Sequence, residues 1–119
     1  MATSSEHFRP EAPYYIKVNI EKYISLAEIA YKSGNIKQAI RHARAGLVRC
    51  RSHGTATALR IFIAKGHSKL GEFDKSNKIY RGLLDERNYL PPVVMGLVYN
   101  NFKNQKIING LRLIKVFVR

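Results

Sequence analysis

The sequence predicts an all-α fold built from consecutive helix hairpins. Apolar residues recur three and four positions apart along most of the chain, which is the period of a helix with one packed face. Gly34 and Gly71 each interrupt this pattern directly before another periodic segment begins. Small residues at Ala27, Ala30 and Ala39 occupy positions where paired helices would approach closely. The stretch around Gly34 is therefore expected to form a helix–turn–helix hairpin.

The hairpin pattern recurs along the chain. Leu70-Gly71-Glu72-Phe73 repeats the turn Ser33-Gly34-Asn35-Ile36, and Asn104-Gln105-Lys106-Ile107 repeats it more weakly. The turn positions 34, 71 and 105 are separated by 37 and 34 residues. A small residue follows each turn, namely Ala39, Ser76 and Gly110.

A helix–turn–helix period of 34 residues is typical of tetratricopeptide repeats, and the chain resembles this family from roughly Asn19 to its C-terminus. The first two repeats match through Leu26-Ala27 with Gly34 and through Ile63-Ala64 with Gly71. The third repeat is degenerate, with Gln105 in place of the turn glycine. The resemblance implies three repeats, at about residues 20–53, 57–90 and 91–119. Together they would form a right-handed solenoid of about six helices with an open C-terminal end.

Local signals place the six helices in order. Residues 1–13 contain Pro10 and Pro13 and are expected to be a flexible tail, with the helical domain occupying residues 14–119. Asn19 and Thr55 are the expected N-caps of the first and third helices. Pro91-Pro92 is expected near the first turn of the fifth helix. The expected helices are Ile20–Lys32, Ile36–Arg49, Ala56–Lys69, Phe73–Asp85, Val93–Phe102 and Ile107–Val118.

Composition favours an acidic partner. The 119 residues suit one domain, and 21 Lys+Arg against 8 Asp+Glu give a net charge of +13. This charge favours nucleic acid, an anionic surface or an acidic protein segment as partner. The single cysteine, Cys50, excludes an internal disulfide framework, and neither a signal peptide nor a membrane span is expected. The cytoplasm is the expected compartment, with the nucleus as the alternative.

The last expected helix, 107–118, is too apolar to keep one solvated face. Helical arrays need a polar helix at each end, and the sequence shows none after this segment. One interpretation is that the helix docks a partner or a second copy of the chain. The other is that the chain carries the truncated or differently spliced end of a longer array. Both interpretations remain open at this stage.

We find no pattern of catalytic residues, so the protein is not expected to be an enzyme or to need a cofactor. The histidines His7, His42, His53 and His67 have no ligand-type spacing to one another or to cysteine, and no metal site is expected. His67 is expected to be a hydrogen-bonded core residue. Glu72 and Asp74 are expected to interact with the positive end of the following helix.

The family resemblance implies a concave groove lined by the first helix of each repeat. Lys32, Lys69 and Lys103 would be equivalent in the three repeats and would form a basic row. Each of these lysines taken alone is better explained as a solvated side chain. The groove positions that would have to hold Lys, Asn or Arg to grip a chaperone C-terminus carry Glu28, Phe62, Pro92 and Gly96 instead. The proposed groove residues are Glu28, Tyr31, Lys32, Phe62, Lys65, Lys69, Tyr99, Phe102 and Lys103.

The second helices carry another set of basic residues, on the side that would be convex. Such a face can follow a phosphate backbone, although basic residues on solvated helices also serve solubility. The residues expected there are Lys37, Arg41, Arg44, Lys75, Lys78 and Arg81.

The preferred interpretation is a non-catalytic interaction module, such as an adaptor, chaperone or assembly factor. It would bind an acidic or amphipathic segment of a partner protein in the concave groove. The alternative is a basic RNA- or DNA-binding module that uses the convex face.

Overall fold

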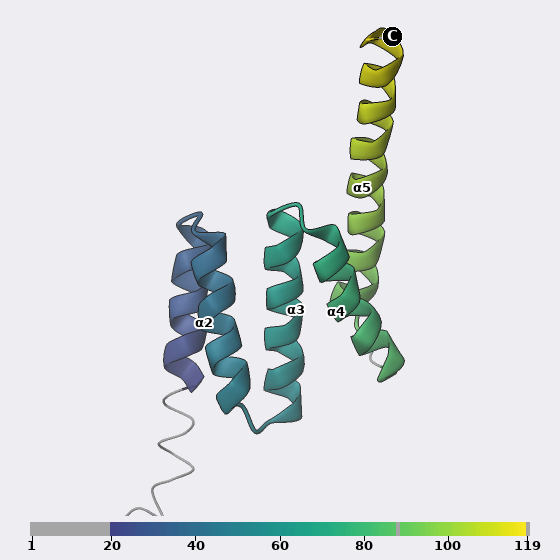
Figure 1. Ribbon diagram of the computed structural model, residues 1–119. Helices are drawn as coiled ribbons and strands as arrows, with labels where there is room; N and C mark the ends of the chain where they lie inside the picture. The colour runs from purple at the N-terminus through teal and green to yellow at the C-terminus, as the bar shows by residue number, and fades with distance from the viewer. Residues whose placement is uncertain (1–19, 88, 119) are drawn as a thin grey trace, which may run out of the picture. The chain divides into compact units, whose positions relative to one another are not determined.

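The computed structural model describes residues 20–87 and 89–118, with side chains placed up to residue 108. Within these ranges the regular structure consists of five helices, without any strand (Figure 1). They are a helix over residues 20–32, α2 (Ile36–Arg49), α3 (His53–Lys69), α4 (Phe73–Asp85) and α5 (Pro91–Val118). The expected all-α class is confirmed for this part of the chain. The expected tail 1–13 and the N-cap Asn19 lie outside the described residues.

The chain divides into two compact units. Unit 1 is Met1–Ile63 and unit 2 is Ala64–Arg119, so the boundary falls within α3. Unit 1 contains the helix 20–32, α2 and the first part of α3. Unit 2 contains the rest of α3, α4 and α5.

A glycine ends the first helix at the position that the sequence indicated. The N–H of Gly34 donates to Tyr31 O (3.1 Å), and the N–H of Asn35 donates to Ala30 O (2.9 Å). These two bonds define a Schellman motif, and Gly34 has the positive φ of 86° that this motif places on its glycine. The side chain of Asn35 then caps α2 by accepting a hydrogen bond from the N–H of Gln38 (3.4 Å).

The turn between α3 and α4 has the same construction 37 positions later. Gly71 has φ 79°, and its N–H donates to Ser68 O (2.9 Å). The N–H of Glu72 donates to His67 O (2.8 Å). The two turns that the sequence predicted most clearly therefore share one backbone geometry.

Unit 1 packs through small and branched residues. The apolar spacing in the sequence puts Ile36, Ala39, Ile40, Ala43 and Leu47 on one side of α2. The first four are less than a tenth exposed, and Leu47 is half-buried. The start of α3 differs from the expectation. The helix begins at His53, and the Ser52 hydroxyl accepts a hydrogen bond from the N–H of Thr55 (3.4 Å). Ser52 therefore acts as the cap in place of Thr55, and the helix is three residues longer at this end than the expected Ala56–Lys69.

The core of unit 2 centres on Tyr80, whose side chain is almost fully buried. α4 packs against the first part of α5 (Figure 1), and a Cβ atom at Gly96 would overlap the Tyr80 ring. Only glycine permits this approach of α5 to α4. Leu83 and Val93, both fully buried, complete the apolar contact.

A buried polar network crosses the same core. The Asn100 side chain is 0% exposed. Its Nδ2 donates to Ser76 Oγ and to Asn77 Oδ1 (2.8 Å each), and its Oδ1 accepts from Ser68 Oγ (2.6 Å). Ser76 Oγ in turn donates to the carbonyl oxygen of Ala64 (2.7 Å). The network therefore joins α3, α4 and α5, and among the described side chains no buried N or O atom lacks a hydrogen-bond partner.

The expected turn at residues 104–107 is wrong. α5 is one continuous helix from Pro91 to Val118, so the separate helices 93–102 and 107–118 do not form a third hairpin. A Schellman turn needs a residue in the left-handed region, which costs an L-residue such as Gln105 about 1–2 kcal/mol. Gln and Lys are also good helix formers, so the chain continues as helix through Gln105 and Lys106.

The network predicts a large effect of one near-isosteric substitution. Asn100→Asp should lower the free energy of unfolding by about 2–3 kcal/mol at pH 7, because an oxygen would then face the acceptors of Ser76 and Asn77. The control is Asn101→Asp, the same change at the next, exposed position of α5. It should stay within about 0.5 kcal/mol. Urea unfolding followed by circular dichroism makes the comparison, and equal effects at the two positions would contradict the role given to the network.

Candidate functional site

An apolar hollow lies in unit 1 between the helix 20–32 and the first part of α3. Its volume is about 140 Å³. The wall contains one charged residue, Glu28, and one aromatic residue, Phe62, both of which the sequence analysis had assigned to a groove. The complete lining is Ile24, Ala27, Glu28, Thr55, Ala58, Leu59 and Phe62.

An aromatic pair adjoins this hollow. The rings of Tyr31 and Phe62 have centroids 5.5 Å apart and are tilted by 57°, an arrangement that aromatic side chains favour. Both residues are half-buried, and Lys32 beside them is exposed. The structure thus brings Glu28, Tyr31 and Phe62 together, as the groove hypothesis requires within unit 1.

The remaining proposed groove residues belong to unit 2. Lys65 and Lys69 are exposed on α3. Tyr99, Phe102 and Lys103 are exposed on α5, and Lys103 Nζ lies 5.6 Å from the centre of the Tyr99 ring. Lys32, Lys69 and Lys103 are all exposed, but they divide between the two units, so their alignment in one row stays a prediction.

A second, more polar hollow lies at the start of α4 in unit 2. It measures about 260 Å³ and is lined by Gly71, Glu72, Phe73, Asp74, Lys75 and Asn104. His67 Nδ1 and Glu72 Oε1 are 2.8 Å apart. Because a carboxylate only accepts hydrogen bonds, the imidazole of His67 is the donor. His67 is buried, which confirms the expectation of a hydrogen-bonded core histidine.

Glu72 and Asp74 lie at the start of α4, where the sequence analysis expected acidic residues to meet the positive end of the helix. Glu72 occupies the N-cap position, yet its side chain makes no capping hydrogen bond and is directed to His67 instead. The hydrogen bond from His67 lowers the pKa of Glu72 below the ordinary 4.5, partial desolvation opposes this, and Lys75 Nζ (3.6 Å from Oε2) lowers it further. The sequence analysis missed this pair because the two residues become neighbours only through the turn at Gly71.

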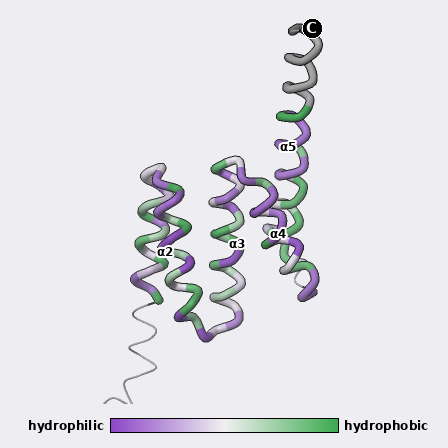
Figure 2. The backbone as a smooth tube through the Cα atoms, viewed as in Figure 1, coloured by the Kyte–Doolittle hydropathy of each residue, from purple (hydrophilic) through white to green (hydrophobic). Residues whose placement is uncertain are grey.

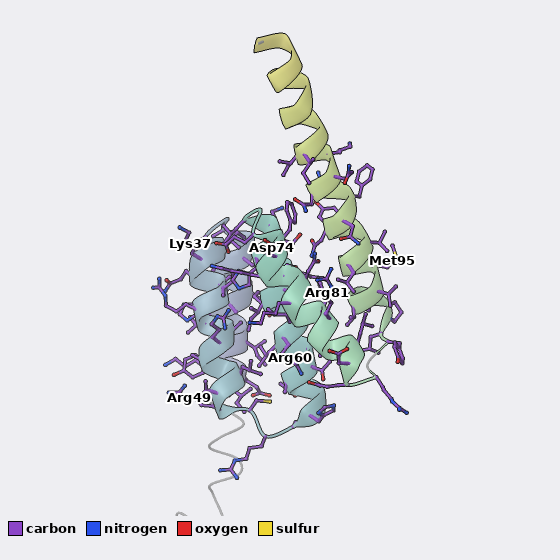
Figure 3. All side chains as sticks on the ribbon, turned by 45° about the vertical axis from the view of Figure 1, so that its right-hand side comes forward. Lys37, Arg49, Arg60, Asp74, Arg81 and Met95 are labelled. Atoms are coloured by element: carbon purple, nitrogen blue, oxygen red, sulfur yellow. The ribbon has the colours of Figure 1, made fainter. Side chains whose placement is uncertain are left out.

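The basic residues assigned to the convex face are all exposed. Lys37, Arg41 and Arg44 lie on α2 in unit 1, four and three positions apart (Figure 3 labels Lys37). Lys75, Lys78 and Arg81 lie on α4 in unit 2. Arg41 Nη1 donates to Gln38 Oε1 (2.8 Å), so this guanidinium is partly held by its own helix.

One surface was found only in part by the sequence analysis, which named Tyr99 and Phe102 as groove residues but did not name Val94 or Val98 beside them. Several large apolar residues in the first half of α5 are exposed. Figure 2 shows this hydrophobic stretch in the first half of α5, followed by a hydrophilic one. The sequence signal was the absence of a helix-ending glycine near Gln105. The exposed residues in the first half of α5 are Val94, Met95, Val98, Tyr99 and Phe102.

Residues 20–87 and 89–118 contain neither a candidate metal cluster nor a candidate membrane span. No group of three or more His, Cys, Asp or Glu side chains in this part of the chain is placed to hold a metal ion. Of the helices described, none combines the length and the apolar character needed to cross a membrane.

Comparisons with known proteins gave no match. No family model, no curated protein and no solved structure matches the chain.

The lowered pKa of Glu72 predicts a pH dependence of stability. A carboxylate whose pKa is lower in the folded than in the unfolded protein stabilises the fold above pH 4.5 and loses this effect as the pH falls through the folded value. Unfolding free energies measured in urea between pH 3 and 6 should therefore fall less steeply below pH 4.5 for Glu72→Gln than for the unmodified protein. Asp85→Asn, at the other end of α4, is the control. An unchanged slope in Glu72→Gln would contradict the assignment.

Proposed function

We propose that the protein is a non-catalytic binding module, an adaptor, chaperone or assembly factor, that holds a segment of another protein. The observation that carries this proposal is the apolar hollow between the helix 20–32 and α3. Its lining offers apolar contact from Ile24, Leu59 and Phe62 and a single carboxylate from Glu28. Apolar anchors in such hollows supply most of the affinity of peptide recognition.

The size of the hollow favours a side chain over a cofactor. Small-molecule sites usually enclose about 300–1,000 Å³, whereas this hollow encloses about 140 Å³. That volume suits one apolar side chain projecting from an extended or helical segment.

Charge adds a second condition on the partner. The net charge of +13 steers acidic segments toward the protein. Glu28 at the hollow repels a carboxylate placed directly beside the anchor. The exposed ammonium group of Lys32, one helical turn further along, instead attracts one. The preferred segment therefore has an apolar anchor with acidic residues displaced toward Lys32.

Two substitutions test the hollow with a selected ligand, an acidic 12-residue peptide with one apolar anchor obtained from a displayed peptide library. Phe62→Ala removes part of the wall and should weaken binding about tenfold, or about 1.4 kcal/mol. Ala58→Leu fills the hollow from an exposed position and should weaken binding at least as much without loosening the core. Titration calorimetry measures both variants.

The matched control is Val48→Ala, which removes an apolar side chain that is 83% exposed on α2. Its affinity should stay within about twofold of the unmodified protein. Circular dichroism establishes that each variant is folded. Wild-type affinity in both Phe62→Ala and Ala58→Leu would contradict the proposed function.

A second candidate function is nucleic-acid binding, favoured by the exposed row Lys37, Arg41 and Arg44 on α2. If these residues contact phosphates, replacing all three by Gln should reduce the slope of log K against log salt by about 2–3 for duplex DNA. Fluorescence anisotropy with a labelled 20-base-pair duplex between 50 and 200 mM salt measures the slope. The control variant neutralises Lys22, Lys32 and Arg51, which removes the same charge from other exposed positions of unit 1. Equal slopes in the two variants would contradict a specific role of the row on α2, because the loss of positive charge alone would then explain the change.

A further inference from the structure

Five large apolar residues form a stripe along the first half of α5. Val94, Met95, Val98, Tyr99 and Phe102 recur three and four positions apart, which places them on one side of the helix. Their exposed fractions run from 41% for Val94 to 62% for Met95. We call this set the α5 stripe.

The α5 stripe lies opposite the face that packs on α4. Val93 and Asn100 are fully buried, and Gly96 meets the Tyr80 ring. These positions differ from the stripe by about half a turn of the helix, at 100° per residue. Figure 3 shows Met95 projecting away from α4. Because the Asn100 hydrogen bonds hold α5 in this rotation, the stripe cannot turn into the core of unit 2.

An exposed stripe of this kind is typical of a docking surface. Monomeric proteins rarely leave a large contiguous apolar patch in water, and the exceptions usually bind something. The stripe runs over about 12 Å of helix, from residue 94 to residue 102. That length corresponds to two to three helical turns of a partner laid alongside it, with anchors at the spacing used in helix recognition.

The charges around the stripe specify the partner. α5 contains no Asp or Glu, while Lys103 and Lys106 follow the stripe directly. Lys103 Nζ lies 5.6 Å from the Tyr99 ring centre, and Lys106 Nζ lies 4.7 Å from that of Phe102. The ammonium groups therefore border the apolar surface itself. A second copy of the chain would bring like charges together, because each copy carries +13. Carboxylates on a partner protein would instead pair with Lys103 and Lys106.

We propose that the α5 stripe binds an acidic amphipathic helix of a partner protein. The apolar side of that helix packs on Met95, Val98 and Phe102, and its carboxylates pair with Lys103 and Lys106. This surface belongs to α5 in unit 2, so the inference is independent of the hollow in unit 1. Phe62→Ala should leave it unchanged.

The probe is a synthetic 18-residue helical peptide with Leu at helical spacing and Glu on its remaining face. A control peptide has Lys in place of every Glu. A second control is a scrambled version of the Glu peptide, with the same composition but without helical periodicity. Binding to the full chain is measured by fluorescence anisotropy at 50 and 300 mM salt. The Glu peptide should bind at least tenfold more tightly than either the Lys or the scrambled peptide at 50 mM salt.

Variants locate the binding surface. Val98→Ser and Phe102→Ser should each weaken binding of the Glu peptide about tenfold at both salt concentrations. Asn101→Ser, an exposed position outside the stripe, should change binding less than twofold. The double variant Lys103→Gln and Lys106→Gln should weaken binding about fivefold at 50 mM salt and little at 300 mM, because salt screens exposed charges. All of these side chains are exposed, so the variants should fold, as circular dichroism would verify.

Three outcomes would overturn the proposal. The first is binding of the Glu peptide that Val98→Ser and Phe102→Ser leave unchanged. The second is a dimer, detected by light scattering, that Phe102→Ser dissociates, because the occupant would then be a second copy. The third is tight association with vesicles of anionic lipid that the stripe variants abolish, together with equally weak binding of the Glu and Lys peptides. The surface would then bind a membrane.

Discussion

The carboxamide of Asn100 is the group on which the arrangement of unit 2 depends. It uses both N–H groups and its oxygen in hydrogen bonds to Ser76, Asn77 and Ser68. Leaving any of these buried groups unpaired costs about 1–3 kcal/mol, so only a narrow range of rotations of α5 about its axis is allowed. Apolar contact around Tyr80 alone would tolerate a wider range of rotations of α5, because hydrophobic burial is non-directional. The network thus decides which face of α5 packs and which face meets solvent.

Two surfaces of different chemistry result from this architecture. The hollow in unit 1 is small, apolar and bordered by Glu28, so in our proposal it suits one apolar side chain without a carboxylate next to it. The α5 stripe is longer, more exposed and bordered by Lys103 and Lys106, so it suits a helix that carries carboxylates. Both surfaces suit side chains of a partner protein, which supports the binding role that we propose. The strongly basic charge favours acidic partners at either surface.

The elements that could be predicted from the sequence are those with local causes. Gly34 and Gly71 marked the two turns because a left-handed residue is needed to close each Schellman motif, and α2 and α4 have the bounds expected for them. Glu28, Tyr31 and Phe62, which the sequence analysis assigned to one groove, come together in unit 1, and their role in binding stays a prediction. The third hairpin was wrong because a repeat spacing was extended to Gln105, a residue with no tendency to end a helix.

By itself, the sequence determined the helical class, the two glycine turns, the packed side of α2 and the basic charge. Each of these follows from the spacing of apolar residues, from the backbone freedom of single residues, or from composition. Only the tertiary structure decided that Glu72 pairs with His67, that Asn100 links three helices and that the α5 stripe is exposed. These features depend on residues that are 5 to 32 positions apart in the chain. Their contacts form only after the turns and the rotation of each helix are set, and a one-dimensional pattern does not contain that rotation.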